Sequence, residues 1–269
     1  MSLIIGLSGK AGTGKDAVAK ILVKEYNFVR VAFADPLKRI CKEIFGFSDE
    51  QLWGPSEKRN EPDKRYPRTH TIPYNLPNDK SQSYICLCCG WDAGTQILDG
   101  RPSPKCYLTP RYALQKIGTE YGRDCYQNVW VDYTLRIVKE LFIDRPDGLA
   151  NYYDPVRGLY QERKSWCMGE HSRIITNFPV GIVISDVRFK NEFERLSQEG
   201  GVVARIVRPD AGLKGSAGEH LSETEINEIS IESYHHTIDN DQSLDDLKKK
   251  ISEWISSDKV FTHIRQGIA

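Results

Sequence analysis

The chain carries no excess of either charge, because 37 Lys and Arg residues balance 37 Asp and Glu residues. A net charge of zero gives no overall attraction for nucleic acid, so any recognition of anions must be local. The chain also lacks an apolar stretch of membrane-spanning length, and the apolar run near its start is too short for a secretory signal. These absences predict a cytoplasmic protein that binds neither membranes nor nucleic acid.

Cysteine is present in an odd number, seven, without an export signal, which favours thiols or metal ligands over disulfides. Residues 86–90 read CLCCG and contain one C-x-x-C pair, but a second such pair is missing. Two alternatives stay open: unlinked buried thiols, or a structural zinc site. The zinc site would take its ligands from Cys86, Cys89, Cys106, Cys167 and His171.

Apolar periodicity predicts an α/β fold in which strands alternate with helices. We expect strands at 3–7, 28–33, 181–185, 202–207 and 236–238, and helices at 15–26, from 35, from 110, at 130–142, from 189 and from 243. This alternation indicates a mainly parallel sheet with helices on both faces. We expect a single domain, with its core in 1–47 and 174–258, a proline-punctuated insertion and helices in 48–146, and a loop or lid in 147–173.

The first loop fits the phosphate-binding pattern G-x-x-x-x-G-K, between a predicted strand and a predicted helix. Its glycines allow backbone N–H groups to face phosphate oxygens, and the helix N-terminus adds partial positive charge. Lys15 would contact the β- and γ-phosphates of ATP, and it is the first catalytic candidate. The predicted ATP-binding residues are Gly9, Gly12, Thr13, Gly14, Lys15 and Asp16.

Asp16 occupies the position at which the common motif has Ser or Thr to hold Mg²⁺. A carboxylate can bind the ion directly or through water, so Asp16 is a candidate Mg²⁺ ligand. The alternative is that Asp16 only caps the helix, because Asp is favoured at helix starts.

An aspartate and an arginine follow the apolar strand near residue 181. Asp186 ends this strand in the manner of a residue that orients Mg²⁺ or its waters, although strand-end aspartates are also common in turns. Arg188 would emerge at the same sheet edge and could neutralise a phosphoryl group in transfer. Its alternative role is a surface ion pair with Glu192.

A further cluster lies on the helix after Pro110, where residues four apart share a face. Arg111 and Arg123 could bind phosphate, and Gln115 could bind a base edge. Phe33 and Trp130 could stack on a nucleobase, but aromatic side chains at such positions are more often part of the core.

Several segments together resemble the deoxynucleoside monophosphate kinases of tailed bacteriophages, within the P-loop nucleoside monophosphate kinase superfamily. They are LSGKAGTGKD at the first loop, FADPLK at 33–38, LQKIGTEYGR at 114–123, NVWVDY at 128–133, SDVRFKNE at 185–192, RIVRP at 205–209 and HLSE at 220–223. The resemblance spans nearly the whole chain. GKD followed by FADPLK and DVRFKNE is much more specific than the phosphate loop alone.

The resemblance implies a P-loop kinase fold and transfer of phosphate from ATP to a deoxynucleoside monophosphate, with Mg²⁺ and often a homodimer. It makes Lys15 the phosphate lysine and Arg188 the arginine that acts in the transition state. It also implies that the monophosphate side includes Asp35, Lys38, Arg111, Arg123 and Asp132. If the chain is encoded by a phage, the host cytoplasm is its expected location.

Three other functions remain as alternatives. The first is a kinase for another small phosphorylated metabolite, of the phosphomevalonate or dephospho-coenzyme A type. The second is a nucleotide-dependent switch, against which the chain has no N-K-x-D segment and no D-x-x-G after a strand. The third is a zinc-stabilised nucleic-acid binder, which the zero net charge disfavours.

Overall fold

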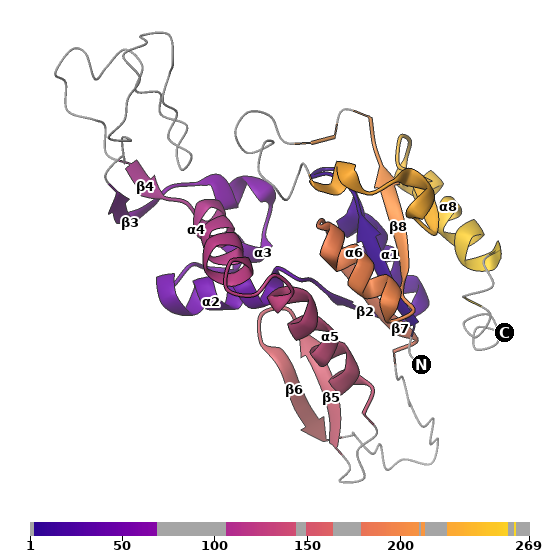
Figure 1. Cartoon of the computed structure of the whole chain (residues 1–269), viewed down its shortest axis with the longest axis horizontal. Helices are drawn as coiled ribbons and strands as arrows, with labels where there is room; N and C mark the ends of the chain where they lie inside the picture. The colour runs from indigo at the N-terminus through magenta and orange to yellow at the C-terminus, as the bar shows by residue number, and fades with distance from the viewer. Residues whose placement is uncertain are drawn as a thin grey trace. The chain divides into compact units, whose positions relative to one another are not determined.

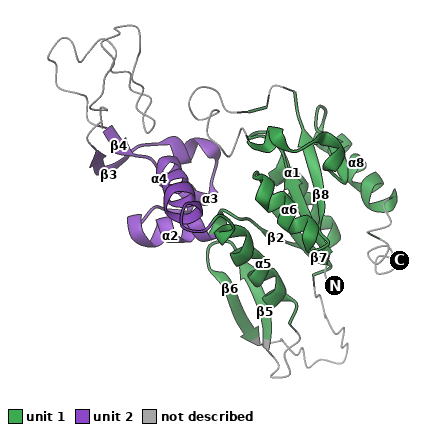
Figure 2. Ribbon diagram, in the orientation of Figure 1, with its two compact units in different colours: residues 1–35, 127–269 green, residues 36–126 purple. Residues whose placement is uncertain are grey.

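The computed structural model describes residues 3–68, 106–143, 149–163, 179–209, 211–212, 225–257 and 261. The chain divides into two compact units (Figure 2). Unit 1 comprises Met1–Asp35 and Gln127–Ala269, and unit 2 comprises Pro36–Tyr126. Among the described residues, no helix combines the length and the apolar character needed to cross a bilayer.

Unit 1 contains a five-stranded sheet in the order β2-β7-β1-β8-β9, and all four strand pairings are parallel (Figure 1). The strands are β1 (Leu3–Ser8), β2 (Phe28–Val31), β7 (Gly181–Val187), β8 (Val202–Val207) and β9 (His236–Asp239). This confirms the predicted parallel sheet, and each expected strand is present.

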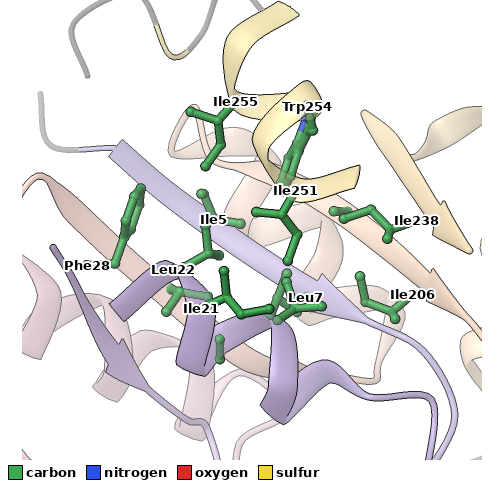
Figure 3. Packing of buried hydrophobic residues seen from close by; sticks show 14 of the residues in the cluster. Ile5, Leu7, Ile21, Leu22, Phe28, Ile206, Ile238, Ile251, Trp254 and Ile255 are labelled. Atoms are coloured by element: carbon green, nitrogen blue, oxygen red, sulfur yellow. The ribbon is translucent and has the colours of Figure 1, made fainter. Parts of the chain in front are cut away.

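Helices cover both faces of this sheet. Alternate residues of β1, Ile5 and Leu7, pack with α1 (Lys15–Tyr26) and α8 (Leu244–Ser257) in one core, which includes Trp254 (Figure 3). Gly6 faces the other way, where an added Cβ would lie 2.9 Å from Leu196 Cδ1 of α6 (Lys190–Gln198). Because both faces are covered, β1 is an almost unbroken apolar run.

The ends of the helices follow local sequence signals. Helix α1 ends at Asn27, which has the left-handed φ of 55° common at helix C-termini. At the start of α8 the Asp246 N–H donates to Ser243 Oγ at 3.2 Å, and the Ser243 N–H donates to Asp246 Oδ2 at 3.2 Å. These two reciprocal bonds form a capping box at the start of the helix expected from residue 243. Helix α5 (Val129–Leu141) matches the expected helix within one residue at each end.

The described part of 147–173 is a β-hairpin, although the sequence showed no period there. Strand β5 (Leu149–Asp154) pairs antiparallel with β6 (Gly158–Arg163). Tyr152 and Tyr160 stack across the pair with ring centroids 5.7 Å apart. The turn forms because Asp154 Oδ1 accepts from the N–H groups of Val156 and Arg157 at 2.9 and 2.8 Å. A lid function for this segment stays a prediction.

Unit 2 is built from short elements around a small apolar core. Its core contains Cys41, Phe47, Leu52 and Ala113. The elements are α2 (Asp35–Phe45), which begins at the last residue of unit 1, α3 (Asp49–Trp53), η1 (Ser56–Asn60), β3 (Asp63–Arg68), β4 (Cys106–Leu108), α4 (Pro110–Lys116) and η2 (Ile117–Arg123). The described parts of the proline-rich stretch thus hold regular structure, in pieces too short to show a period.

The helix after Pro110 changes its hydrogen-bonding pattern halfway. Thr109 Oγ1 accepts from the Tyr112 N–H at 3.2 Å and so caps α4, the helix expected from residue 110. From Ile117 the chain continues as a π-helix, η2, in which Gly118 and Gly122 are buried. An added Cβ at Gly118 would lie 3.2 Å from Leu37 Cδ1, so glycine permits close packing on α2. π-helical segments are rare and frequently lie at functional sites.

The carboxylate of Asp63 in unit 2 is held by a two-point contact with Arg65. The Arg65 guanidinium binds this carboxylate in a bidentate manner. Its Nε donates to Oδ1 at 2.9 Å and its Nη2 donates to Oδ2 at 2.6 Å. Only 8% of the Asp63 side chain is exposed. The hydrogen bond from Arg65 is the main cause that lowers the pKa of Asp63 to about 2.

Asp63→Asn should therefore destabilise the protein at neutral pH. A carboxylate whose pKa is lowered on folding adds stability above its unfolded pKa, and this stability is lost as the pH falls through the folded value of about 2. We expect the thermal midpoint at pH 7 to drop by about 2–4 °C relative to wild type. The difference should shrink as the pH falls below 4 and vanish only below the folded pKa of about 2. Glu61→Gln, which removes an exposed partner of Lys58, is the matched control and should change the midpoint much less. A difference independent of pH would contradict the assignment.

Candidate active site

The carboxyl ends of the three strands β2, β7 and β1 meet at one edge of the sheet, because the strands are parallel neighbours. The glycine loop follows β1 at this edge. Asp186 is the second-to-last residue of β7, and Arg188 directly follows this strand. Residues 32–35 follow β2. Ligands of open α/β sheets bind at this edge.

The loop after β1 depends on three glycines with positive φ: 147° at Gly9, 80° at Gly12 and 99° at Gly14. A Cβ at Gly9 would lie 2.5 Å from the carbonyl oxygen of Ile206, and one at Gly14 would overlap the side-chain amide of Asn240. Both positions therefore need glycine for space as well as for conformation. Asn240 also donates from Nδ2 to the Thr13 carbonyl at 2.9 Å, a contact that no sequence pattern indicated.

The side chain of Lys15 turns back into the glycine loop and bonds to its backbone. Its Nζ donates to the carbonyls of Gly9 at 2.6 Å and Lys10 at 2.7 Å, and only 7% of the residue is exposed. The Thr13 hydroxyl donates to the same Lys10 carbonyl at 3.0 Å. The ammonium is thus held inside the loop, where an incoming phosphate would compete with the two carbonyls for it.

Asp16 is in the first turn of α1, and 71% of its side chain is exposed. Its Oδ1 accepts from Arg30 Nη2 at 2.7 Å. The N-cap residue of α1 is Gly14, and in the described part of the chain no side chain bonds to the helix start as a cap, which was the alternative role for Asp16. An exposed carboxylate beside a phosphate loop suits Mg²⁺, which is usually held by one or two carboxylates, waters and substrate phosphates. The donor set present therefore fits this ion.

Asp186 is bonded through both of its oxygens to the chain that follows β2. Oδ1 accepts from the Phe33 N–H at 2.8 Å, and Oδ2 accepts from the Ala34 N–H at 2.9 Å. Asp35, of which 2% is exposed, accepts at Oδ2 from the Ala32 N–H at 3.0 Å and from the Tyr153 hydroxyl at 2.9 Å. Two carboxylates thus fasten the turn that leads into α2.

Glu192 organises the chain around Arg188, although the sequence suggested only a surface ion pair between them. Its buried carboxylate accepts through Oε2 from the N–H of Arg188 at 2.8 Å and of Phe189 at 3.1 Å. Glu192 therefore caps the start of α6 through the backbone. A Glu at the third helical position was the available sequence signal.

The remaining candidates of unit 1 have packing or charge partners. Phe33 and Trp130 are 3% and 9% exposed, which agrees with the core alternative. Asp132 Oδ1 accepts from Arg195 Nε at 3.2 Å. Their contacts with a base or a monophosphate stay predictions.

The unit 2 candidates lie on α2, α4 and η2. The Lys38 ammonium lies 5.6 Å from the centre of the Trp53 ring. Arg111 donates from Nε to Asn60 Oδ1 at 2.5 Å and from Nη2 to Ser56 Oγ at 2.7 Å, so it is anchored to η1.

Arg111 and Gln115 share a face of α4, as predicted, but Arg123 is the last residue of the π-helix. In η2 the i→i+5 bonding changes the number of residues per turn, so the four-residue spacing of α4 does not extend to Arg123. Its role as a phosphate ligand stays a prediction.

The zinc alternative concerns residues that are mostly outside the described ranges, namely Cys86, Cys89, Cys167 and His171. Cys106 lies in β4 and is buried. Within the described part of the chain, no three or more His, Cys, Asp or Glu side chains gather as a metal site would require.

Comparisons with known proteins give one relative that matches nearly the whole chain and another that matches about three quarters of it. A protein of Acanthamoeba polyphaga mimivirus, provisionally named a deoxynucleotide monophosphate kinase, is 28% identical over 249 residues, which is 93% of this chain and 94% of that protein. The deoxynucleoside-5'-monophosphate kinase of Escherichia phage T5 is 26% identical over 221 residues, 74% of this chain and 73% of the phage protein. No family model matches the chain. The two relatives confirm the resemblance drawn from the sequence motifs.

Proposed function

We propose that this chain is an ATP-dependent deoxynucleoside monophosphate kinase, which transfers the γ-phosphate of ATP to a dNMP and yields dNDP and ADP. The observation that carries the proposal is the loop between β1 and α1, where Lys15 lies inside a curl of three positive-φ glycines at the carboxyl edge of a parallel sheet. The similarity to two named kinases over most of the chain supports the choice of acceptor.

The loop supplies the donor site. Its backbone N–H groups and the N-terminus of α1 would bind the phosphates of ATP, and Lys15 would exchange the carbonyls of Gly9 and Lys10 for phosphate oxygens. Asp16 would hold Mg²⁺, directly or through water. When bound, Mg²⁺ would neutralise charge on the phosphates. Asp186 keeps the turn after β2 in place through two N–H groups.

The proposed acceptor-binding residues are Phe33, Asp35, Lys38, Arg111, Gln115, Arg123, Trp130 and Asp132. Arginine suits this task because its planar guanidinium can hold two phosphate oxygens at once. Arg188 would meet the negative charge that spreads over the phosphoryl group during transfer. Catalysis then rests mainly on positioning and charge stabilisation.

We also propose that the enzyme works in the cytoplasm, that of the host if a phage encodes it, and that it can form a homodimer. A kinase for another phosphorylated metabolite remains the second candidate, because the donor loop would be the same. The acceptor distinguishes the two.

A coupled assay of ADP release across the common dNMPs and NMPs tests the proposal. We expect turnover with at least one dNMP and little ATP hydrolysis without an acceptor, because water must be kept from the γ-phosphate. Phosphomevalonate and dephospho-coenzyme A serve as competing acceptors. Turnover with either of these, and with no dNMP, would overturn the proposed substrate.

A further inference from the structure

Arg30 of β2 bridges two other elements at the sheet edge that carries the phosphate loop. Its Nε donates to Ser185 Oγ of β7 at 2.9 Å, and its Nη2 donates to Asp16 Oδ1 of α1 at 2.7 Å. Figure 2 shows β2, β7 and α1 within unit 1. No motif in the sequence pointed to Arg30.

The Arg30 guanidinium is fixed by two hydrogen bonds, one from Nε to Ser185 and one from Nη2 to Asp16. In the parallel register Arg30 pairs with Val183, so Ser185 lies two residues further toward the carboxyl edge. The side chain of Arg30 therefore runs along the sheet toward the loop. Ser185 is 2% exposed, which makes it a fixed anchor in the sheet. The anchored guanidinium can in turn fix the direction of the much more exposed Asp16 carboxylate.

Arg30 also places a positive charge beside the proposed cation ligand. Its hydrogen bond to Asp16 is accepted by Oδ1, so the second carboxylate oxygen, Oδ2, is the one considered for a cation. A cation at Oδ2 would feel both the attraction of the carboxylate and the repulsion of the guanidinium. The side chains of Arg30 and Asp16 are 33% and 71% exposed, so solvent screens both terms and their effect on affinity is modest. Nucleotide phosphates would bring enough negative charge to offset the repulsion.

We propose that Arg30 is a positioning residue of the cation site: it orients Asp16 through Oδ1, and its charge weakens capture of a free divalent cation, so that the cation enters together with the nucleotide. This inference rests on the proposed function, because it takes Asp16 as a ligand of the cation that accompanies ATP.

Binding of Mn²⁺ to the nucleotide-free protein, followed by the electron paramagnetic resonance of free Mn²⁺, tests the proposal directly. Arg30→Gln should lower the Kd for Mn²⁺ about three- to tenfold, because the repelling charge is gone. Arg30→Lys keeps the charge and should stay within about twofold of wild type. ADP should tighten Mn²⁺ binding less in Arg30→Gln than in wild type, by about the same factor that separates the two free proteins.

The double-mutant cycle with Asp16→Asn makes the test specific. Asp16→Asn removes the carboxylate that would hold the cation beside Arg30, so the Mn²⁺ binding that remains at other sites should have the same Kd with and without Arg30→Gln. The thermal midpoint checks folding, and Arg30→Met replaces Arg30→Gln if the latter does not fold. An unchanged Kd in Arg30→Gln, or an equal change in both backgrounds, overturns the proposal. The titration needs no acceptor, so an enzyme that phosphorylates no dNMP would refute the proposed function without deciding this one.

Discussion

Replacing Lys15 with alanine should lower kcat for phosphoryl transfer by about a thousandfold or more. Charge develops on the transferred group during the reaction, and Lys15 is the cation that the loop holds at this point. An interaction that is strongest in the transition state affects kcat more than ground-state binding. Initial rates at saturating ATP and acceptor measure the change.

The loss should not come from unfolding. Lys15→Ala removes two hydrogen bonds inside the loop, but α1 packs in the core through Val18, Ile21 and Leu22, which the substitution leaves in place. The thermal midpoint of Lys15→Ala should therefore stay within a few degrees of wild type. Lys20→Ala, on the exposed side of the same helix, is the matched control and should retain normal kcat. A folded Lys15→Ala protein with near-normal kcat would remove the assignment of the phosphate loop.

Arg188→Ala should also depress kcat, by on the order of a thousandfold, with a smaller change in the KM for the acceptor. Glu192 fixes the backbone at Arg188 through its N–H, so this contact survives the substitution and the chain should keep its path. Arg188→Lys should recover only part of the rate, since a lysine restores a point charge without the planar fork that holds two oxygens.

Arg123→Ala provides the comparison for Arg188. If Arg123 binds the monophosphate in the ground state, its removal should raise the KM for the dNMP while the KM for ATP changes little. Should Arg188→Ala instead raise only the KM for the acceptor, Arg188 belongs to monophosphate binding. The transition-state cation would then have to be sought elsewhere, with Arg157 in the β5–β6 hairpin as a first candidate.

The sheet and its flanking helices could be predicted because their signals are local. The run of β1, the glycine loop and the period of α1 lie in 24 consecutive residues, Leu3 to Tyr26. The residues that cap α8 also lie within four consecutive positions, Ser243 to Asp246. Each of these patterns carries its physical cause within a few turns of chain.

The β5–β6 hairpin and the π-helix η2 could not be predicted in the same way. The hairpin strands have six residues each, and tyrosines occupy both faces, so no clean alternation marks them. In η2 the change from α to π bonding accompanies the packing of Gly118 on Leu37, a contact between residues far apart in sequence. Short segments take their structure from such tertiary contacts more than from propensity.

The candidate site shows the same division. Lys15, Asp16, Asp186 and Arg188 follow motifs and could be named from the sequence. Asn240, which holds the loop through the Thr13 carbonyl, and Arg30, which binds Asp16, come from distant parts of the chain. No local pattern distinguishes them from ordinary surface residues. The hydrogen bond from Tyr153 to Asp35 joins residues 118 positions apart, and no local pattern in the sequence indicated it either.

Transfer of the terminal phosphate itself is the most direct test of the central claim. Wild-type protein incubated with ATP labelled at the γ-phosphate, Mg²⁺ and a single dNMP should place the label on the β-phosphate of the corresponding dNDP, with unlabelled ADP as the other product. Lys15→Ala should give no labelled dNDP under the same conditions. Label that appears only as free phosphate, or that never leaves ATP with any of the four common dNMPs, would contradict the proposed kinase activity.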